Sequence, residues 1–255
     1  MHVCLVSPAW RRFDVTRLAL AQRAHLRGVL AGRGHEVTGV IVADDDNLDI
    51  AREYGFETVE RDNTFLGRKF NDGLERALDM GAEVVVLIGS DDWVHPDVFD
   101  RMPLAESEVP VPSLEEPAVT WNVAPEIVSG RWISFVDMAT GRIRMCQSGT
   151  RSGSIPWLIH RDALLPSGGR PIRETQQKGT DFALVAGLNV QPTWVFHDPN
   201  PVARVDFKTS VNLNDFDITT GILEHSGDLD AFDVLGDYYP AELVEMARDT
   251  MAVLA

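Results

Sequence analysis

Two adjacent carboxylates end the most apolar stretch of this chain of 255 residues. Residues 82–88 are almost entirely aliphatic, and Gly89, Ser90, Asp91 and Asp92 follow them. Such a run is typical of a strand buried on both faces of a parallel sheet. In open α/β sheets, ligands bind beyond the carboxyl ends of the strands, and carboxylate oxygens are preferred by hard cations that also bind phosphates. These residues predict a metal and nucleotide site.

A second acidic cluster, Asp44, Asp45 and Asp46, follows the apolar residues 37–43. An aspartate at that place can accept hydrogen bonds from a base or a ribose. The alternative is that Asp46 or Asn47 only caps the next helix. Because three carboxylates are more than a cap needs, we expect Asp44 or Asp45 to contact a ligand.

A third polar group opens a predicted helix near residue 66. Gly67, Arg68 and Lys69 stand at its start, and Asn71 follows. The N-terminus of a helix with basic neighbours suits an anion such as a diphosphate. A capped, solvated helix start is the alternative interpretation.

The elements that must position these residues alternate between strand and helix. Apolar periodicity and closing glycines mark each boundary. The resulting βαβαβαβ order predicts an α/β fold with a mostly parallel sheet and right-handed crossovers. We expect strands at 3–7, 37–43, 56–59 and 82–88, and helices at 15–30, 48–54 and 70–78.

The pattern changes after residue 102. Residues 103–117 are rich in proline and glutamate and predict a loop or linker, and residues 148–153 predict a mobile polar segment. A short turn containing Gly141 predicts a β-hairpin over 132–138 and 142–147. Further on we expect a helix at 181–188, a strand at 190–196 and a helix at 240–254.

Composition narrows the class of protein. The net charge of −16 opposes sequence-independent binding to a nucleic-acid backbone, although a local basic groove stays compatible with it. No apolar run reaches the roughly 18 residues of a membrane span, and no signal peptide is evident. The two cysteines, Cys4 and Cys146, form no metal or disulfide pattern. We expect a cytoplasmic enzyme with small-molecule or protein partners.

In order and content, residues 1–105 resemble the nucleotide-binding half of a GT-A-fold glycosyltransferase of the family 2 type. The matching pieces are residues 41–47, 67–73, Gly81 before its strand, and 90–97, which look like the D-x-D region and the run after it. More narrowly, the chain is similar to glycosyltransferases encoded by actinobacterial phages. It departs from the pattern at Gly89, where many members carry the first aspartate. The resemblance implies nucleotide-sugar contacts from Pro8, Asp44, Asp45, Gly67, Lys69, Asn71, Ser90 and Asp91.

The resemblance also implies one continuous domain, with a nucleotide-sugar half at 1–105 and an acceptor-side half with the C-terminal helix at 106–255. Asp91 and Asp92 would hold Mn²⁺ or Mg²⁺, with His197 as a further ligand. Asp181 would be the general base, although Thr180 stands where the family has glutamate and both residues could simply start a helix. Trp157 could stack on a sugar, and Lys208 could reach a phosphate; core burial and solvent exposure are the respective alternatives.

These features predict a metal-dependent, inverting glycosyltransferase that uses a nucleotide sugar, with a UDP-sugar as the first expectation. The acceptor would be a hydroxyl of a protein, a small molecule or a modified DNA base, in the host cytoplasm if the chain is encoded by a phage. Two alternatives stay open. One is a degenerate domain that binds a nucleotide sugar or a partner without transfer. The other is a sugar-nucleotide nucleotidyltransferase, which would need a glycine-rich loop where residues 7–12 contain none.

Overall fold

A computed structural model describes most of the chain. The predicted linker at 103–117, the polar segment at 148–153 and the strand at 190–196 lie outside the described residues. The described residues are 1–44, 46–101, 127–128, 132–147, 157–177, 180–188, 202–210, 216–217 and 226–254.

The first sheet has the strand order β3-β2-β1-β4-β9-β6. The four strands predicted in the first third of the chain lie side by side and parallel. Of the two later strands, β9 pairs antiparallel with β4, and β6 pairs antiparallel with β9. The predicted α/β fold with a mostly parallel sheet is therefore confirmed. The strands are β1 (His2–Pro8), β2 (Glu36–Ala43), β3 (Glu57–Glu60), β4 (Val84–Leu87), β6 (Ile127–Val128) and β9 (Trp157–His160).

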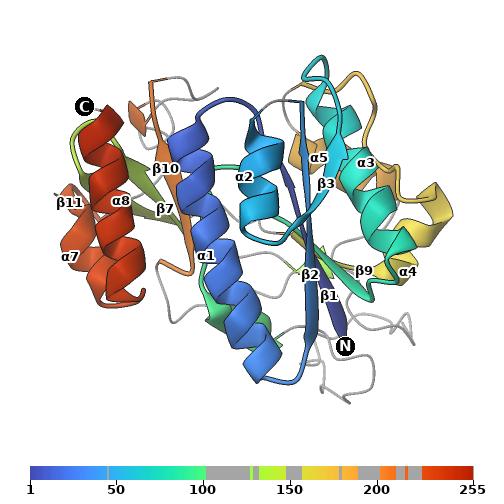
Figure 1. The fold of residues 1–255 in the computed structure, drawn as a ribbon, viewed down its shortest axis with the longest axis horizontal. Coiled ribbons are helices and arrows are strands. Elements are labelled where there is room, and N and C mark those ends of the chain that lie inside the picture. The colour runs from blue at the N-terminus through green and yellow to red at the C-terminus, as the bar shows by residue number, and fades with distance from the viewer. Residues whose placement is uncertain are drawn as a thin grey trace, which may run out of the picture.

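Helices cover both faces of this sheet (Figure 1). On one face α3 (Leu66–Asp79), α4 (Arg161–Leu164) and α5 (Thr180–Leu188) pack their apolar side chains onto β1, β2 and β9. On the other face lie α1 (Phe13–Gly32) and α2 (Asn47–Glu53). This double coverage explains why β4 is apolar throughout: all of its side chains are buried.

The second sheet has the order β11-β8-β7-β10-β5. It contains the predicted hairpin, in which β7 (Trp132–Asp137) pairs antiparallel with β8 (Arg142–Gln147). The hairpin is flanked by β10 (Arg204–Lys208) and β11 (Leu229–Asp230), and β5 (Asp92–Val94) forms the far edge. Residues Pro96–Arg101 follow β5 as a 3-10 helix. The C-terminal helices α7 (Ala231–Gly236) and α8 (Ala241–Leu254) pack against this sheet and against α1.

The two sheets exchange strands between the two halves of the sequence. The early strand β5 belongs to the second sheet, and the late strand β9 belongs to the first. Trp93 anchors the exchange, because it is fully buried and its ring lies 4.9 Å from the rings of both Phe207 and Tyr239. The chain segment that carries Asp91 and Asp92 is thereby held between the two sheets.

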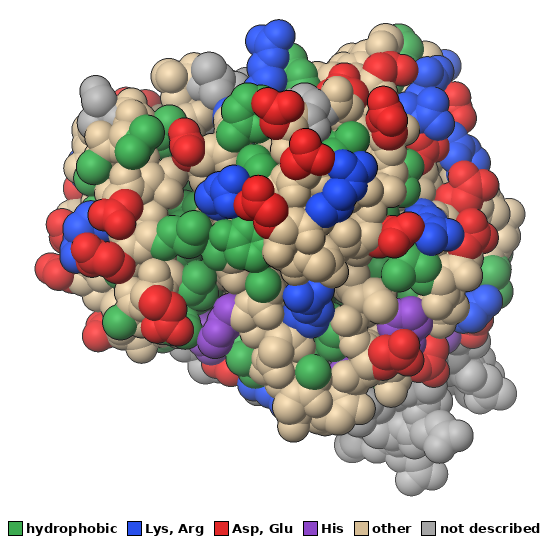
Figure 2. Space-filling model, in the orientation of Figure 1, with side chains coloured by type: hydrophobic (Ala, Val, Ile, Leu, Met, Phe, Trp, Pro, Cys, Tyr) green, Lys and Arg blue, Asp and Glu red, His purple; other side chains and the backbone are tan. Residues whose placement is uncertain are grey.

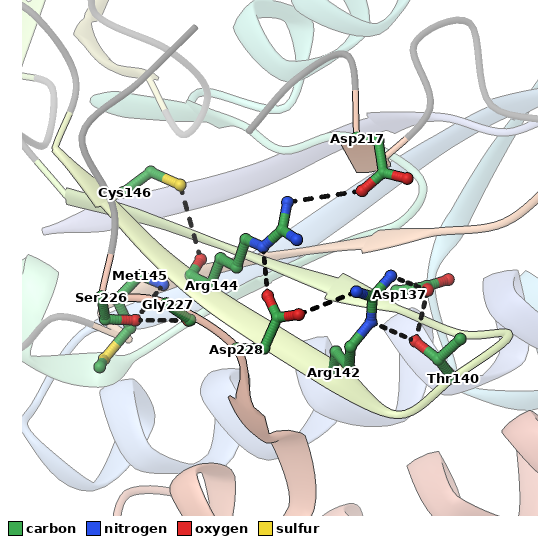
Figure 3. A network of polar contacts seen from close by, with 10 residues as sticks. All are labelled: Asp137, Thr140, Arg142, Arg144, Met145, Cys146, Asp217, Ser226, Gly227 and Asp228. Carbon is green, nitrogen blue, oxygen red and sulfur yellow. Dashed lines mark hydrogen bonds and ion pairs between the residues drawn. The ribbon is translucent and has the colours of Figure 1, made fainter. Parts of the chain in front are cut away.

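A polar network ties residues 226–228 to the hairpin (Figure 3). Asp228 accepts hydrogen bonds from Arg142 at 2.8 Å and from Arg144 at 2.5 Å. Both guanidinium groups also lie over the ring of Phe216. The hydrogen bonds that Arg144 and Arg142 donate to Asp228 are the main reason why the pKa of its carboxyl group is lowered. This network fixes the edge of the second sheet.

The surface shown in Figure 2 carries many acidic side chains with basic ones interspersed among them. No large basic patch is visible on that face, in keeping with the net charge of −16. Among the described residues, no helix combines the length and the apolar character that crossing a membrane requires.

Candidate metal and nucleotide site

Three aspartates meet where the two sheets exchange strands. Antiparallel pairing of β5 with β10 places Asp92 directly opposite Asp206, and the N–H of Phe207 donates to the carbonyl of Asp91 at 3.0 Å. One carboxylate oxygen from each of Asp91, Asp92 and Asp206 lies within 4.8 Å of the others. The backbone pairing of two strands therefore builds an oxygen-rich cluster beyond the end of β4.

Basic side chains surround this cluster. Arg12 donates from one guanidinium nitrogen to Asp91 Oδ2 and from the other to Ser90 Oγ, both at 2.8 Å. Lys208 Nζ donates to Asp206 Oδ2 at 2.7 Å. Arg23, which is only 1% exposed, donates to the carbonyl of Gly89. The site thus contains both acceptors for a cation and donors for an anion.

The loop after β1 holds Arg12 in an unusual backbone conformation. Arg11 and Arg12 have φ values of 50° and 48°, in the left-handed region that a residue with a side chain adopts at a cost of about 1–2 kcal/mol. The amide of Asn47 donates to the carbonyl of Arg11 at 3.2 Å and braces this turn. Strained residues of this kind gather at functional sites, because surrounding contacts must maintain them.

Burial and like charges shift the pKa of the carboxylates. Burial raises the pKa of Asp92 to about 8, and the charges of Asp206 and Asp91 add to the effect, whereas Arg204 and Lys208 oppose it. Burial likewise raises the pKa of Asp206, against the charge of Lys208. Burial lowers the pKa of Arg23 to about 10 despite the nearby charges of Asp92 and Asp91. When burial and like charges raise the pKa of a carboxyl group in this way, a bound cation stabilises its charged form strongly.

The donor set fits a hard divalent cation. Its ligands would be carboxylate oxygens, as Mg²⁺ and Mn²⁺ prefer. Asp206 Oδ1 is buried, and no donor among the described residues hydrogen-bonds to it. A buried acceptor without a donor calls for an explanation, and a bound cation is one that suits a carboxylate oxygen. The predicted ligands Asp91 and Asp92 lie together, and Asp206 joins them.

A second polar group lies at the ends of β1 and β2. Lys69, 1% exposed, donates to the carbonyl of Ala9 at 2.9 Å and lies 3.7 Å from Asp44 Oδ1. The other oxygen of Asp44 accepts the N–H of Asn63 at 2.9 Å. Pro8 is buried at the end of β1, next to Ala9. Asp44 is thus held in a fixed orientation at the carboxyl edge of the parallel sheet, and its ligand role stays a prediction.

Two predicted binding residues on α3 make contacts within the protein. The amide of Asn71 accepts from the N–H of Ile172 at 3.0 Å and donates to its carbonyl at 2.6 Å. A Cβ added to Gly67 would lie 2.3 Å from the carbonyl oxygen of Arg173. Both residues dock residues 172–176 onto the start of α3, and neither points to a ligand by these contacts.

The remaining predicted site residues have varied placements. Trp157 is 1% exposed and lies in the core beside Leu87, so contact with a sugar would require it to leave the core. Asp181 lies in the first turn of α5, close to the start predicted for that helix. Asp45 and His197 lie outside the described residues.

Sequence reasoning missed the part that the second sheet contributes. Asp206 alternates with apolar residues in β10 and looks like an ordinary surface position of a strand. Lys208, for which the sequence suggested a phosphate contact with solvent exposure as the alternative, is 8% exposed and paired with Asp206. Arg12 had one available signal, since it follows the first strand at the edge where ligands bind.

The sequence matches no protein-family model and no curated protein. Solved structures with a similar arrangement include S. aureus TarS 1-349 in complex with UDP-GlcNAc, with 12% identity over 98% of this chain and 72% of that chain, at a TM-score of 0.49. Another crystal structure of TarS 1-349 has 13% identity over 78% of this chain and a TM-score of 0.48, and this chain covers 58% of its length. A glycosyltransferase involved in glycosylation of the major capsid of PBCV-1 has 11% identity over 81% of this chain and 92% of that chain, at a TM-score of 0.43. These likenesses are too remote to assign an activity or a ligand.

Proposed function

We propose that this protein is a metal-dependent glycosyltransferase that moves a sugar from a nucleotide sugar to a hydroxyl acceptor. The observation that carries the proposal is the meeting of Asp91, Asp92 and Asp206 with Arg12 and Lys208 beyond the carboxyl end of β4. Oxygen ligands for a divalent cation and donors for a diphosphate lie together there, at the edge of the sheet where nucleotides bind in α/β folds. A UDP-sugar is the first donor to test.

In this proposal Asp91, Asp92 and Asp206 hold Mn²⁺ or Mg²⁺, which when bound supplies charge neutralisation for the leaving diphosphate. Arg12 and Lys208, which pair with Asp91 and Asp206, would donate to phosphate oxygens of the diphosphate. Asp44, oriented by Lys69 and Asn63, would accept a hydrogen bond from the nucleoside.

Asp181 would take the proton of the acceptor hydroxyl as its oxygen attacks the anomeric carbon from the side opposite the leaving group. Base catalysis of this kind contributes about 10²–10⁴-fold to the rate. Such an attack inverts the anomeric configuration. The acceptor would be a protein, a small molecule or a modified DNA base, and the phage and cytoplasmic context stays part of the proposal.

The test is release of nucleoside diphosphate from a panel of nucleotide sugars with Mn²⁺, for the wild type, Asp91→Ala and Asp181→Asn. We expect turnover with one nucleotide family, none for Asp91→Ala, and a large loss for Asp181→Asn. Asp162→Ala, an exposed aspartate on α4, is the control and should keep the wild-type rate. Wild-type turnover by a folded Asp91→Ala variant would overturn the proposal.

One observation favours a second candidate, a domain that binds a nucleotide sugar without transfer. Arg12 already pairs with Asp91, and Lys208 already pairs with Asp206, so the carboxylates have cationic partners before any metal arrives. This candidate predicts nucleotide binding that is equal in Mn²⁺ and in EDTA, with no product on any acceptor.

A further inference from the structure

The carboxylate of Asp92 lies where a side chain at position 89 would be. The φ of Gly89 is not positive, unlike those of Gly34, Gly55 and Gly81, so the backbone there does not require a glycine. A Cβ built on Gly89 would lie 2.4 Å from Asp92 Oδ2 and 3.2 Å from Asp92 Cγ. Real Cβ atoms essentially never show contacts under 3.0 Å, so a side chain at position 89 and the carboxylate of Asp92 could not both keep these positions. The carboxylate of Asp92 therefore occupies the volume that a side chain at position 89 would fill.

Hydrogen bonds hold the carboxylate of Asp92 in that volume. The N–H of Gly89 donates to Asp92 Oδ2 at 3.0 Å, and the N–H of Asp92 donates back to the carbonyl of Gly89 at 3.3 Å. Arg23 donates to the same carbonyl. Residues 89–92 thus form a closed turn in which the side chain of the last residue returns to the backbone of the first.

The strands on either side prevent this turn from shifting. Ile88 donates to the carbonyl of Val6 at 2.9 Å, which fixes the chain just before the turn. Trp93 is fully buried and fixes the chain just after it. A side chain added at position 89 would therefore displace the carboxylate of Asp92, since the backbone on both sides is anchored.

We propose that Gly89 is a positioning residue whose missing side chain makes room for the carboxylate of Asp92, so that position 92 supplies the cation ligand from the space beside position 89. The ligand part of this inference rests on the proposed function. The steric part does not, because it concerns only how Gly89 and Asp92 share one volume.

The experiment is a double-mutant cycle with Gly89→Ala, Asp92→Ala and the double variant, measured twice. Thermal unfolding in EDTA reports the steric part, and titration with Mn²⁺ alone, followed by the EPR signal of the free ion, reports the ligand part. Gly28→Ala is the control, because a Cβ there meets nothing within 4 Å and its φ is not positive. It should leave Mn²⁺ binding unchanged.

We expect Gly89→Ala to lower the melting temperature in EDTA when Asp92 is present and to have little effect in the Asp92→Ala background. Gly89→Ala and Asp92→Ala should each weaken Mn²⁺ binding by about 10–100-fold, the range typical of lost support in metal sites. The double variant should bind no more weakly than either single variant, because Gly89→Ala displaces the same carboxylate that Asp92→Ala removes.

Asp92→Asn separates shape from charge. In EDTA, Gly89→Ala should destabilise the Asp92→Asn background as much as it destabilises the wild type, because the amide fills the same volume as the carboxylate. Asp92→Asn alone should bind Mn²⁺ more weakly than the wild type, because the charge is lost. Equal destabilisation by Gly89→Ala in both backgrounds would overturn the steric part. The ligand part alone would be overturned if the wild type and Asp92→Ala bound Mn²⁺ equally well while the effects of the two substitutions on the melting temperature in EDTA were non-additive. A wild type that binds no Mn²⁺ would refute the proposed metal dependence and the ligand part together, and the EDTA cycle would still decide the steric part.

Discussion

Replacing Arg12 by alanine should make this protein bind Mn²⁺ more tightly. Arg12 donates to Asp91 Oδ2 at 2.8 Å, and both side chains are largely buried, with 18% and 16% of their surfaces exposed. A cation that uses Asp91 must compete with this guanidinium for the same oxygen. Deleting the arginine removes the competitor.

The magnitude follows from that contact. Hydrogen bonds to charged groups contribute about 1.5–3 kcal/mol, and each 1.4 kcal/mol corresponds to a factor of ten in affinity. We therefore expect the Kd for Mn²⁺ to fall by roughly 10–100-fold in Arg12→Ala. In EDTA the same variant should lose stability, since Asp91 is left without this partner close to Asp92 and Asp206.

The assay is titration of the nucleotide-free protein with Mn²⁺, followed by EPR or calorimetry. Arg17→Ala is the matched control: it breaks an arginine–carboxylate pair between α1 and Glu53 of α2, but both of those side chains are well exposed. Arg12→Gly should be more stable in EDTA than Arg12→Ala by about 1 kcal/mol, because glycine adopts the left-handed conformation without strain. An unchanged or weakened affinity in Arg12→Ala would show that the cation and Arg12 do not share Asp91.

Three further predictions test other parts of the structure. Asp206→Asn should weaken Mn²⁺ binding about tenfold or more, whereas Asp228→Asn, which also breaks ion pairs with basic residues, should leave it unchanged in the same titration. Asn71→Ala should lower the free energy of unfolding by about 2–3 kcal/mol in the absence of any nucleotide, because the N–H and the carbonyl of Ile172 lose their partner; an unfolding curve like that of the wild type would contradict this contact. Burial raises the pKa of Cys4 and of Cys146 from 9.0 to about 11, so the folded protein binds more protons than the unfolded chain in that range, and the free energy of unfolding should fall as the pH rises from about 9 to 11. Both thiols should resist a disulfide reagent at pH 8 until the chain unfolds, and rapid labelling of the native protein would refute their burial.

Local patterns in the sequence were enough to predict the first sheet. The apolar run before Gly89 and the alternation of strands with glycine-ended helices predict β1 to β4 and α1 to α3 with small shifts at the ends. The reason is that a strand covered on both faces has apolar side chains at consecutive positions, and such a run can be recognised in the sequence itself. The hairpin of β7 and β8 was predicted for a similar reason, because its turn is local.

The candidate site was predicted only in part, because part of it depends on contacts between distant segments. Asp91 and Asp92 were found because they follow a strand in the sequence. Asp206 was missed because its place opposite Asp92 comes from the pairing of β5 with β10, which no local pattern shows. The role of Gly89 was equally hidden, since the sequence shows only the absence of a side chain and the structure shows what fills its volume.

The most direct test of the central claim is thermal unfolding of the wild type with UDP, GDP, CDP and TDP and their common sugars, each with Mn²⁺ or with EDTA. A ligand at about 100 times its Kd adds about 2.7 kcal/mol to the free energy of unfolding, which raises the melting temperature by several degrees in a protein of this size. The account predicts such a shift for one nucleotide family in Mn²⁺, its loss in EDTA, and its loss in Asp91→Ala. A shift of the same size in EDTA, or none with any nucleotide, would contradict a metal-bridged nucleotide site at Asp91, Asp92 and Asp206.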